Sequence, residues 1–285
     1  MGCGSYTASD WDKLRTSRNI DTSSVRELFG SESMLDKYNP YYIARREAHD
    51  NDEHPNSTPI AIGVDVTGSM GYLSEEIIKN GLNELMKKLY ASQVIPDPQL
   101  MFAACGDYDD YAPLQVTQFE SDIRIAEQLL ELWLEGHGCG NGGEDYQLLW
   151  YFLAKHTDID CFKKRNIKGF AFTIGDEPVH SVIRPETFKK VFNEDNMETV
   201  KTSDVIKMCE EKYNLFHIAI DKGYDVANVI PGKTILISKS EVSYIPEIII
   251  TVICKVKGLK TEDILGDLDP TVEKIIAKAI KNVKF

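Results

Sequence analysis

The sequence carries little positive charge for its length. Its 285 residues include 32 lysines and arginines against 45 aspartates and glutamates, which gives a formal net charge of -13 at pH 7. Nucleic-acid binding normally needs a basic face, so this composition disfavours a nucleic-acid partner. An acidic surface can still attract cations or a basic protein partner.

Long apolar runs and paired cysteines are also missing. The best apolar run, residues 248–254, has only the length of a strand and is too short to cross a membrane, so we expect no membrane partner. The 6 cysteines are scattered, and none has Cys-x-x-Cys spacing. The N-terminus lacks the apolar region of a secretion signal. We therefore expect reduced thiols and a cytoplasmic location.

Apolar strand-like runs alternate with amphipathic helical patterns in the central part of the chain. The strand-like runs are residues 60–66, 100–105, 167–174 and 215–220, and helical spacing is clearest over 72–89. Residues 114–119 follow a turn and indicate a hairpin. This order predicts an α/β fold with a doubly wound, mostly parallel sheet, one antiparallel edge hairpin and helices on both faces.

The flanking segments differ from this central region in composition. Residues 1–58 are polar with scattered aromatics, and Ser24 to Glu27 has capping-box spacing, so we expect an N-terminal arm that packs on the domain. The domain itself is predicted over 59–257, with a polar insertion at about 183–202 and a helix over 245–256. Residues 258–285 are predicted to form a C-terminal helical extension in which Thr271 caps a docked helix.

Acidic and hydroxyl side chains follow the predicted strands. Asp65, Thr67 and Ser69 come at the end of the first strand, and Asp176 comes at the end of a later one. Sites in such sheets lie at the carboxyl ends of the strands. Oxygen ligands of this kind suit a small hard cation such as Mg²⁺.

A second acidic group lies in the turn after the second strand. Asp107, Asp109 and Asp110 could form another cation site, but Asp is common in turns and we favour a solvated acidic turn.

The first of these groups resembles a known motif. Asp65-Val66-Thr67-Gly68-Ser69 is similar to the first motif of the metal-ion-dependent adhesion site in von Willebrand factor type A domains, Asp-x-Ser-x-Ser or Asp-x-Thr-x-Ser. The resemblance covers about residues 59–257. It implies a Rossmann-like fold and a metal site formed by Asp65, Thr67, Ser69 and Asp176.

The middle element of the motif departs from the family. The family usually has Gly-Gly-Thr, whose threonine contacts the metal, whereas this chain has Gly142-Gly143-Glu144-Asp145. That variant is more similar to bacterial and kinase-associated members. Either Glu144 or Asp145 could be a metal ligand, and either could instead stabilise a helix N-terminus.

The resemblance implies an intracellular protein of bacterial or phage type that binds Mg²⁺, or else Mn²⁺ or Ca²⁺. The open metal position would accept an acidic side chain of a protein partner, and a MoxR-type AAA+ ATPase is a candidate partner. One alternative is a structural subunit of a bacterial or phage assembly, with a metal that binds no partner.

A third possibility is a Mg²⁺-dependent phosphohydrolase, and the residues argue against it. In haloacid dehalogenase phosphatases a second Asp follows the nucleophile by two residues, where this chain has Thr67. The glycine-rich residues 138–143 lack the lysine of a phosphate-binding loop. His137 and Cys139 provide only two possible zinc ligands. We therefore expect no enzymatic activity.

Overall fold

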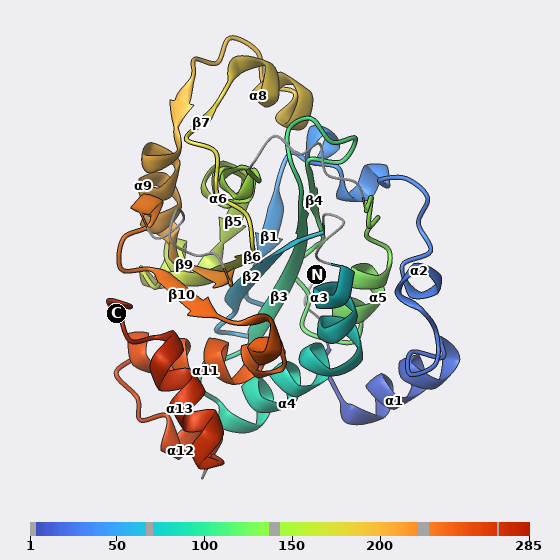
Figure 1. Cartoon of the computed structure of the whole chain (residues 1–285), viewed down its shortest axis with the longest axis vertical. Coiled ribbons are helices and arrows are strands. Elements are labelled where there is room, and N and C mark those ends of the chain that lie inside the picture. Colours follow the sequence, from blue (N-terminus) through green and yellow to red (C-terminus); the bar gives the residue numbers. More distant parts are fainter. Residues whose placement is uncertain (1–3, 67–70, 137–142, 222–227, 267) are drawn as a thin grey trace.

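A six-stranded sheet forms the centre of the molecule (Figure 1). The computed structural model describes residues 4–66, 71–136, 143–221, 228–266 and 268–285. Across the sheet the strands are β10 (Thr234–Ile237), β9 (Tyr213–Ile220), β6 (Gly169–Gly175), β2 (Thr58–Asp65), β3 (Pro98–Cys105) and β4 (Leu114–Val116). All neighbours are parallel except the antiparallel edge pair of β3 and β4. The predicted sheet and its edge hairpin are confirmed.

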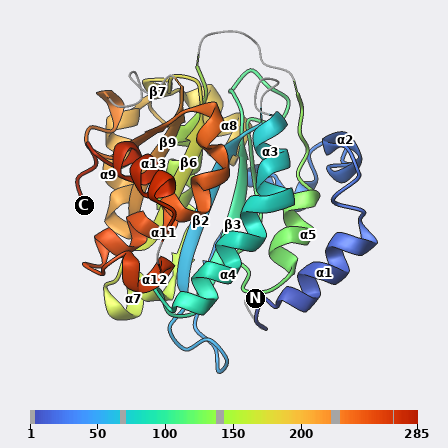
Figure 2. The same ribbon diagram turned by 60° about the horizontal axis from the view of Figure 1, so that its bottom comes forward.

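Side chains alternate between the two faces of this sheet, as strand geometry requires. In β2, Ile60, Ile62 and Val64 pack with α4 (Leu82–Ser92), α5 (Arg124–Leu130) and α11 (Ile245–Val256). On the other face, Ala61 packs with α6 (Tyr146–Lys155), α8 (Pro185–Phe192) and α9 (Thr202–Lys212). Every residue of β2 is buried, because helices cover both faces. Figure 2 shows the helices on either side of the strands. The predicted doubly wound arrangement is therefore confirmed.

The helices have the following bounds: α1 (Ala8–Ser17), α2 (Val25–Leu28), α3 (Gly71–Glu76), α4 (Leu82–Ser92), α5 (Arg124–Leu130), α6 (Tyr146–Lys155), α7 (Asp160–Arg165), α8 (Pro185–Phe192), α9 (Thr202–Lys212), α11 (Ile245–Val256), α12 (Glu262–Leu265) and α13 (Pro270–Ala279). A π-helical turn, η4 (Ile77–Gly81), joins α3 to α4, so the predicted helix over 72–89 is longer and interrupted. Short 3₁₀ segments are η1 (Asp36–Tyr38), η2 (Pro40–Tyr42) and η5 (Lys239–Tyr244). The helix predicted over 245–256 is confirmed as α11.

The N-terminal segment packs along α4 and α5 (Figures 1 and 2). Trp11 is only 1% exposed and belongs to the same apolar cluster as α4, and the Tyr6 hydroxyl donates to Asn83 Oδ1 at 3.1 Å. The capping box at Ser24 is present as predicted. The charged run after Arg45 was not expected to form a strand, yet β1 (Arg46–Ala48) pairs in parallel with β5 (Thr157–Ile159). The boundary at residue 58 stays a prediction.

Two other expectations need correction. The polar insertion contains α8 and a small antiparallel pair, β7 (Val182–Ile183) with β8 (Val200–Lys201), because Phe188 and its neighbours give α8 an apolar face that packs on α6. The last helix, α13, is capped by Asp269 rather than Thr271, since the Asp269 side chain accepts from the Thr271 amide. Ile276 of α13 is buried in the cluster that contains α11.

Candidate metal site at the carboxyl edge of the sheet

Two predicted ligands come from neighbouring central strands. Asp65 is the last residue of β2, and Asp176 directly follows β6, which pairs with β2. The next strand in the sequence, β3, pairs with one side of β2, whereas the later strand β6 pairs with the other side of β2 and β9 lies beyond it. Ligands in open α/β sheets bind at this kind of switch point. Thr67 and Ser69 lie outside the described residues, so their part in the site stays a prediction.

Asp65 is fully buried and held by a tyrosine. Its Oδ2 accepts a hydrogen bond from the Tyr146 hydroxyl at 3.1 Å. Tyr146 begins α6 and is itself fully buried, and burial together with the Asp65 charge raises the pKa of its hydroxyl. Gly175 makes room for the ring, because a Cβ there would lie 1.9 Å from the Tyr146 oxygen. The strand end and the helix start therefore fit together around the Asp65 carboxylate.

Tyr72 of α3 faces the same negatively charged region. Burial, followed by the charges of Asp176, Asp221 and Asp65, raises the pKa of Tyr72 to about 12. Lys239 places its Nζ 3.9 Å from the centre of the Tyr72 ring. The Lys239 ammonium therefore makes a cation–π contact with Tyr72 at the border of this acidic region.

Glu144 brings a third carboxyl group toward Asp65. Its side chain is buried, and its Oε2 has no hydrogen-bond partner among the described residues. Burial raises the pKa of Glu144 to about 10, and among the neighbouring charges Asp65 contributes most. A buried carboxylate without a donor or a cation is costly, so its surroundings favour the protonated form of Glu144.

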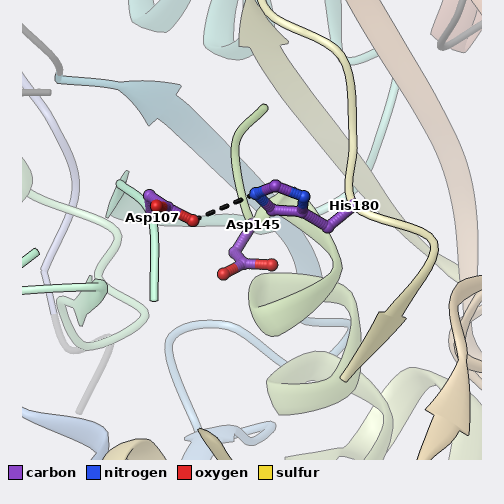
Figure 3. Close-up of side chains that lie close together, drawn as sticks. All are labelled: Asp107, Asp145 and His180. Atoms are coloured by element: carbon purple, nitrogen blue, oxygen red, sulfur yellow. Dashed lines mark hydrogen bonds and ion pairs between the residues drawn. The ribbon is translucent and has the colours of Figure 1, made fainter. Parts of the chain in front are cut away.

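Asp145 turns to a different group of side chains. Its Oδ2 accepts from the Tyr108 amide at 2.8 Å, and its Oδ1 accepts from the Gln147 side chain. Asp107, Asp145 and His180 each offer one ligand atom, and these atoms lie within 4.8 Å of one another (Figure 3). Within the described ranges this is the group of three that meets this spacing, and Asp65, Glu144 and Asp176 do not.

The structure therefore separates two neighbours that the sequence could not. Asp145 lies with Asp107 and His180, whereas the Glu144 carboxyl group is close enough to Asp65, Asp110 and Asp107 for the charges of all three to act on it. The metal-ligand roles of Asp65, Asp176, Glu144 and Asp145 stay predictions.

The favoured interpretation of the Asp107 turn as solvated is wrong for two of its three acids. Asp107 is 2% exposed and Asp110 4% exposed, and only Asp109 faces solvent. Asp110 folds inward because its Oδ2 accepts from the Asp107 amide at 2.8 Å. The same inward fold directs Asp107 toward His180, whose Nε2 lies 3.1 Å from Asp107 Oδ1.

Sequence reasoning missed His180 and Tyr146. His180 follows Asp176 by four residues and so belongs to the segment after β6, a signal that could have been used. Tyr146 directly follows Asp145, where a tyrosine in an apolar helix is easily taken for packing alone. Its role depends on the approach of α6 to β2 and β6, which no local pattern predicts.

No protein-family model and no curated protein matches the sequence. The pilus adhesin SpaC from Lactobacillus rhamnosus GG is a similar solved structure, with 7% identity over 82% of this chain and 31% of that chain and a TM-score of 0.43. Proximal thread matrix protein 1 from the mussel byssus has 11% identity over 70% of this chain and 48% of that chain, with a TM-score of 0.46. The vWF domain of the type V pili tip protein Mfa5 from Porphyromonas gingivalis has 8% identity over 71% of this chain and 96% of that chain, with a TM-score of 0.44. The chain thus spans about a third of SpaC and half of the mussel protein. With TM-scores below 0.5, these similarities carry no argument about the site.

Proposed function

We propose that this chain is a von Willebrand factor type A protein that binds a partner protein through a divalent cation, Mg²⁺ in the first instance. Asp65, Thr67, Ser69 and Asp176 would hold the ion, with Glu144 as the ligand from the middle motif. Their oxygen atoms suit Mg²⁺, or Mn²⁺ and Ca²⁺ with longer bonds. The ion would polarise and orient a ligand at its open position.

The buried Glu144 carboxyl carries most of this proposal. It lies near the Asp65 carboxylate at the switch point, and its Oε2 has no described hydrogen-bond partner. Proteins normally bond or pair such groups, and unsatisfied ones concentrate at functional sites. A cation would pair with Glu144 once its proton is lost, and would screen it from Asp65.

The number of carboxylates bears on how a partner binds. Asp65, Asp176 and Glu144 together bring three negative charges to an ion of charge two, which weakens its attraction for a partner carboxylate. We therefore infer that the acidic side chain of the partner binds only weakly through the metal, or through water. This charge balance also favours the second candidate, a structural metal that only holds the strand ends together.

A MoxR-type AAA+ ATPase is the partner class that the family resemblance suggests, and a cytoplasmic location fits it. Four cysteines, Cys105, Cys161, Cys209 and Cys254, are buried free thiols, which supports a reducing compartment. No described helix is long and apolar enough to span a membrane. We propose a binding role without enzymatic activity.

The test is a calorimetric titration of Mg²⁺ into the metal-free full chain, beside Asp65→Asn and Asp204→Asn. Asp204 is an exposed aspartate on α9 and serves as the matched control. We expect one bound ion in the wild type and the control, and at least a hundredfold weaker binding in Asp65→Asn. Equal binding by Asp65→Asn would contradict the proposed site.

Partner binding is tested by capture of the ATPase candidate with and without chelator. The proposed function predicts capture that needs Mg²⁺ and fails in Asp65→Asn. Capture that survives chelator in a chain shown to bind Mg²⁺ would favour the structural metal instead.

A further inference from the structure

The Asp107–Asp145–His180 cluster has the geometry of a preformed metal site. His180 Nε2 and Asp107 Oδ1 are 3.1 Å apart, and all three candidate ligand atoms lie within 4.8 Å of one another (Figure 3). Two ligands on one ion at about 2.0–2.2 Å are themselves roughly 3.0–3.6 Å apart. One pair already has this spacing, and the third ligand needs only a small movement.

Backbone hydrogen bonds fix the three segments that carry these side chains. The Asp145 amide donates to Gly106 O at 3.2 Å, which ties the start of α6 to the loop after β3. The Glu144 amide donates to Pro178 O at 2.8 Å, and the His180 amide donates to Glu144 O at 3.4 Å. Asp107, Asp145 and His180 are therefore brought together by the fold rather than by chance contact of mobile side chains.

Lys190 binds the backbone of the turn that carries Asp107. Lys190 Nζ, on α8, donates to the carbonyl oxygens of Tyr108 at 2.6 Å and Asp110 at 2.8 Å. The Lys190 ammonium thus binds backbone, and His180 is the cationic or neutral group that lies against the Asp107 carboxylate.

A buried polar atom beside the cluster points to a missing ligand. Gln147 is fully buried, and its Nε2 donates to Asp145, yet its Oε1 has no hydrogen-bond partner among the described residues. A water molecule bound to a cation would supply the donor that this oxygen atom lacks.

We propose that Asp107, Asp145 and His180 form a second cation site, which takes a divalent transition metal such as Zn²⁺ rather than Mg²⁺. An imidazole nitrogen favours zinc and its neighbours over magnesium, whereas the Asp65 group offers only oxygen atoms. The His180 side chain is 27% exposed, so an ion can enter and keep water at its remaining positions.

The two sites would be adjacent but chemically distinct. Glu144 would belong to the first and Asp145 to the second, so one peptide bond joins their ligands. The second site does not depend on the proposed function, because none of its ligands comes from Asp65, Thr67, Ser69 or Asp176.

The test is a titration of Zn²⁺, and of Co²⁺ as its spectroscopic substitute, into the full chain with Mg²⁺ in excess. We expect one ion per chain, Co²⁺ ligand-field bands without thiolate charge transfer, and at least tenfold weaker binding in His180→Gln. His49→Gln is the matched control, because His49 Nε2 lies 3.5 Å from Asp158 Oδ1 far from this cluster. Circular dichroism checks the fold of each variant, and Asp107→Asn replaces His180→Gln if that variant unfolds.

Three results would overturn the site. They are no Zn²⁺ binding by the wild type, unchanged affinity in a folded His180→Gln or Asp107→Asn variant, and loss of the signal in Cys139→Ser. Asp65→Asn separates this proposal from the first one, since it should abolish Mg²⁺ binding and leave Zn²⁺ binding intact.

Discussion

The two ends of the central sheet treat aspartates in opposite ways. At the amino edge, burial alone would raise the pKa of Asp50, but hydrogen bonds from Arg165 and Ser57 lower it to about 2. At the carboxyl edge, burial raises the pKa of Asp145 to about 7 against the opposing charge of His180. Both carboxyl groups are largely buried, so the difference lies in their partners.

The contrast is between a buried carboxylate whose basic partners are supplied by the fold and buried carboxyl groups that still need a cation. Asp50 contacts two basic residues, since Lys164 Nζ also lies 3.3 Å from its Oδ2, and so it has the cations that a poorly solvated carboxylate needs. Among the described residues, the carboxyl edge gathers Asp65, Glu144 and Asp107, and there burial raises the pKa of Glu144 instead of being offset by a bonded cation. Folding rules broken in one place usually mark a functional site, and a divalent cation is the partner that would complete this edge.

The largest effect on folding is expected at the amino edge of the sheet, where Asp50 has its basic partners. Asp50→Asn should lower the free energy of unfolding at pH 7 by about 1–3 kcal/mol, because Arg165 and the Ser57 hydroxyl lose a charged acceptor. The folded pKa of Asp50 is depressed, so its contribution is present above the unfolded pKa near 4 and is lost as pH falls toward about 2.

Urea unfolding at several pH values measures this effect. The difference between wild type and Asp50→Asn should shrink as pH falls from about 4 to about 2. Asp204→Asn is the control, since the Asp204–Lys207 pair is exposed and screened by solvent and salt. A loss that stays the same at low pH would contradict the role given to this ion pair.

A smaller effect should appear in metal binding when Tyr146 loses its hydroxyl. Tyr146→Phe keeps the ring, which packs 4.9 Å from the His217 ring, but removes the hydrogen bond to Asp65 Oδ2. We expect Mg²⁺ affinity to fall about tenfold, as when other groups that orient metal ligands are removed.

Tyr151→Phe is the matched control for that variant. Tyr151 lies on the same helix and donates to Glu194 Oε2 at 2.7 Å, away from the proposed ligands. Calorimetry should give wild-type affinity for this control. An equal fall in both variants would mean that α6 is disturbed generally and that Tyr146 has no specific role.

The smallest expected effect is a gain in stability at the carboxyl edge of the sheet. The folded pKa of Glu144 is raised to about 10, so as pH rises above the unfolded value near 4.3 the unfolded chain ionises while the folded chain keeps the proton, and stability is lost. Glu144→Gln should therefore unfold with a free energy about 1 kcal/mol higher than wild type at pH 8 in chelator, with little difference at pH 4. Thermal or urea unfolding measures it, and a variant less stable at pH 8 would contradict the argument.

The sheet could be predicted from the sequence because its strands are continuous apolar runs. Residues 60–66 and 215–220 cannot be exposed on either face, and that alone indicates a sheet covered by helices. The pairing of β1 with β5 could not be predicted, since the charged residues around Arg46 have no strand pattern. Likewise, α8 was hidden by the many charges around its apolar face.

The site was predictable only as a set of strand ends. Asp65 and Asp176 follow apolar strands, and their placement at one edge follows from parallel pairing. Glu144 and Asp145 are adjacent residues before a helix, and the direction of each side chain is set by the backbone there, which no composition or spacing encodes. His180 reaches Asp107 only because the segment after β6 pairs with Glu144.

The proposed pairing of a divalent cation with the buried carboxyl groups, Glu144 above all, accounts for the carboxyl edge of the sheet. It is tested most directly by calorimetric titration of Mg²⁺ at pH 7.5 in two buffers with different ionisation enthalpies, for wild type and Glu144→Gln. We predict that wild type releases about one proton per bound ion, because Glu144 must ionise to become a ligand, and that Glu144→Gln releases fewer. Mg²⁺ binding with no proton release in wild type, or no binding of any divalent ion by the folded chain, would contradict this claim.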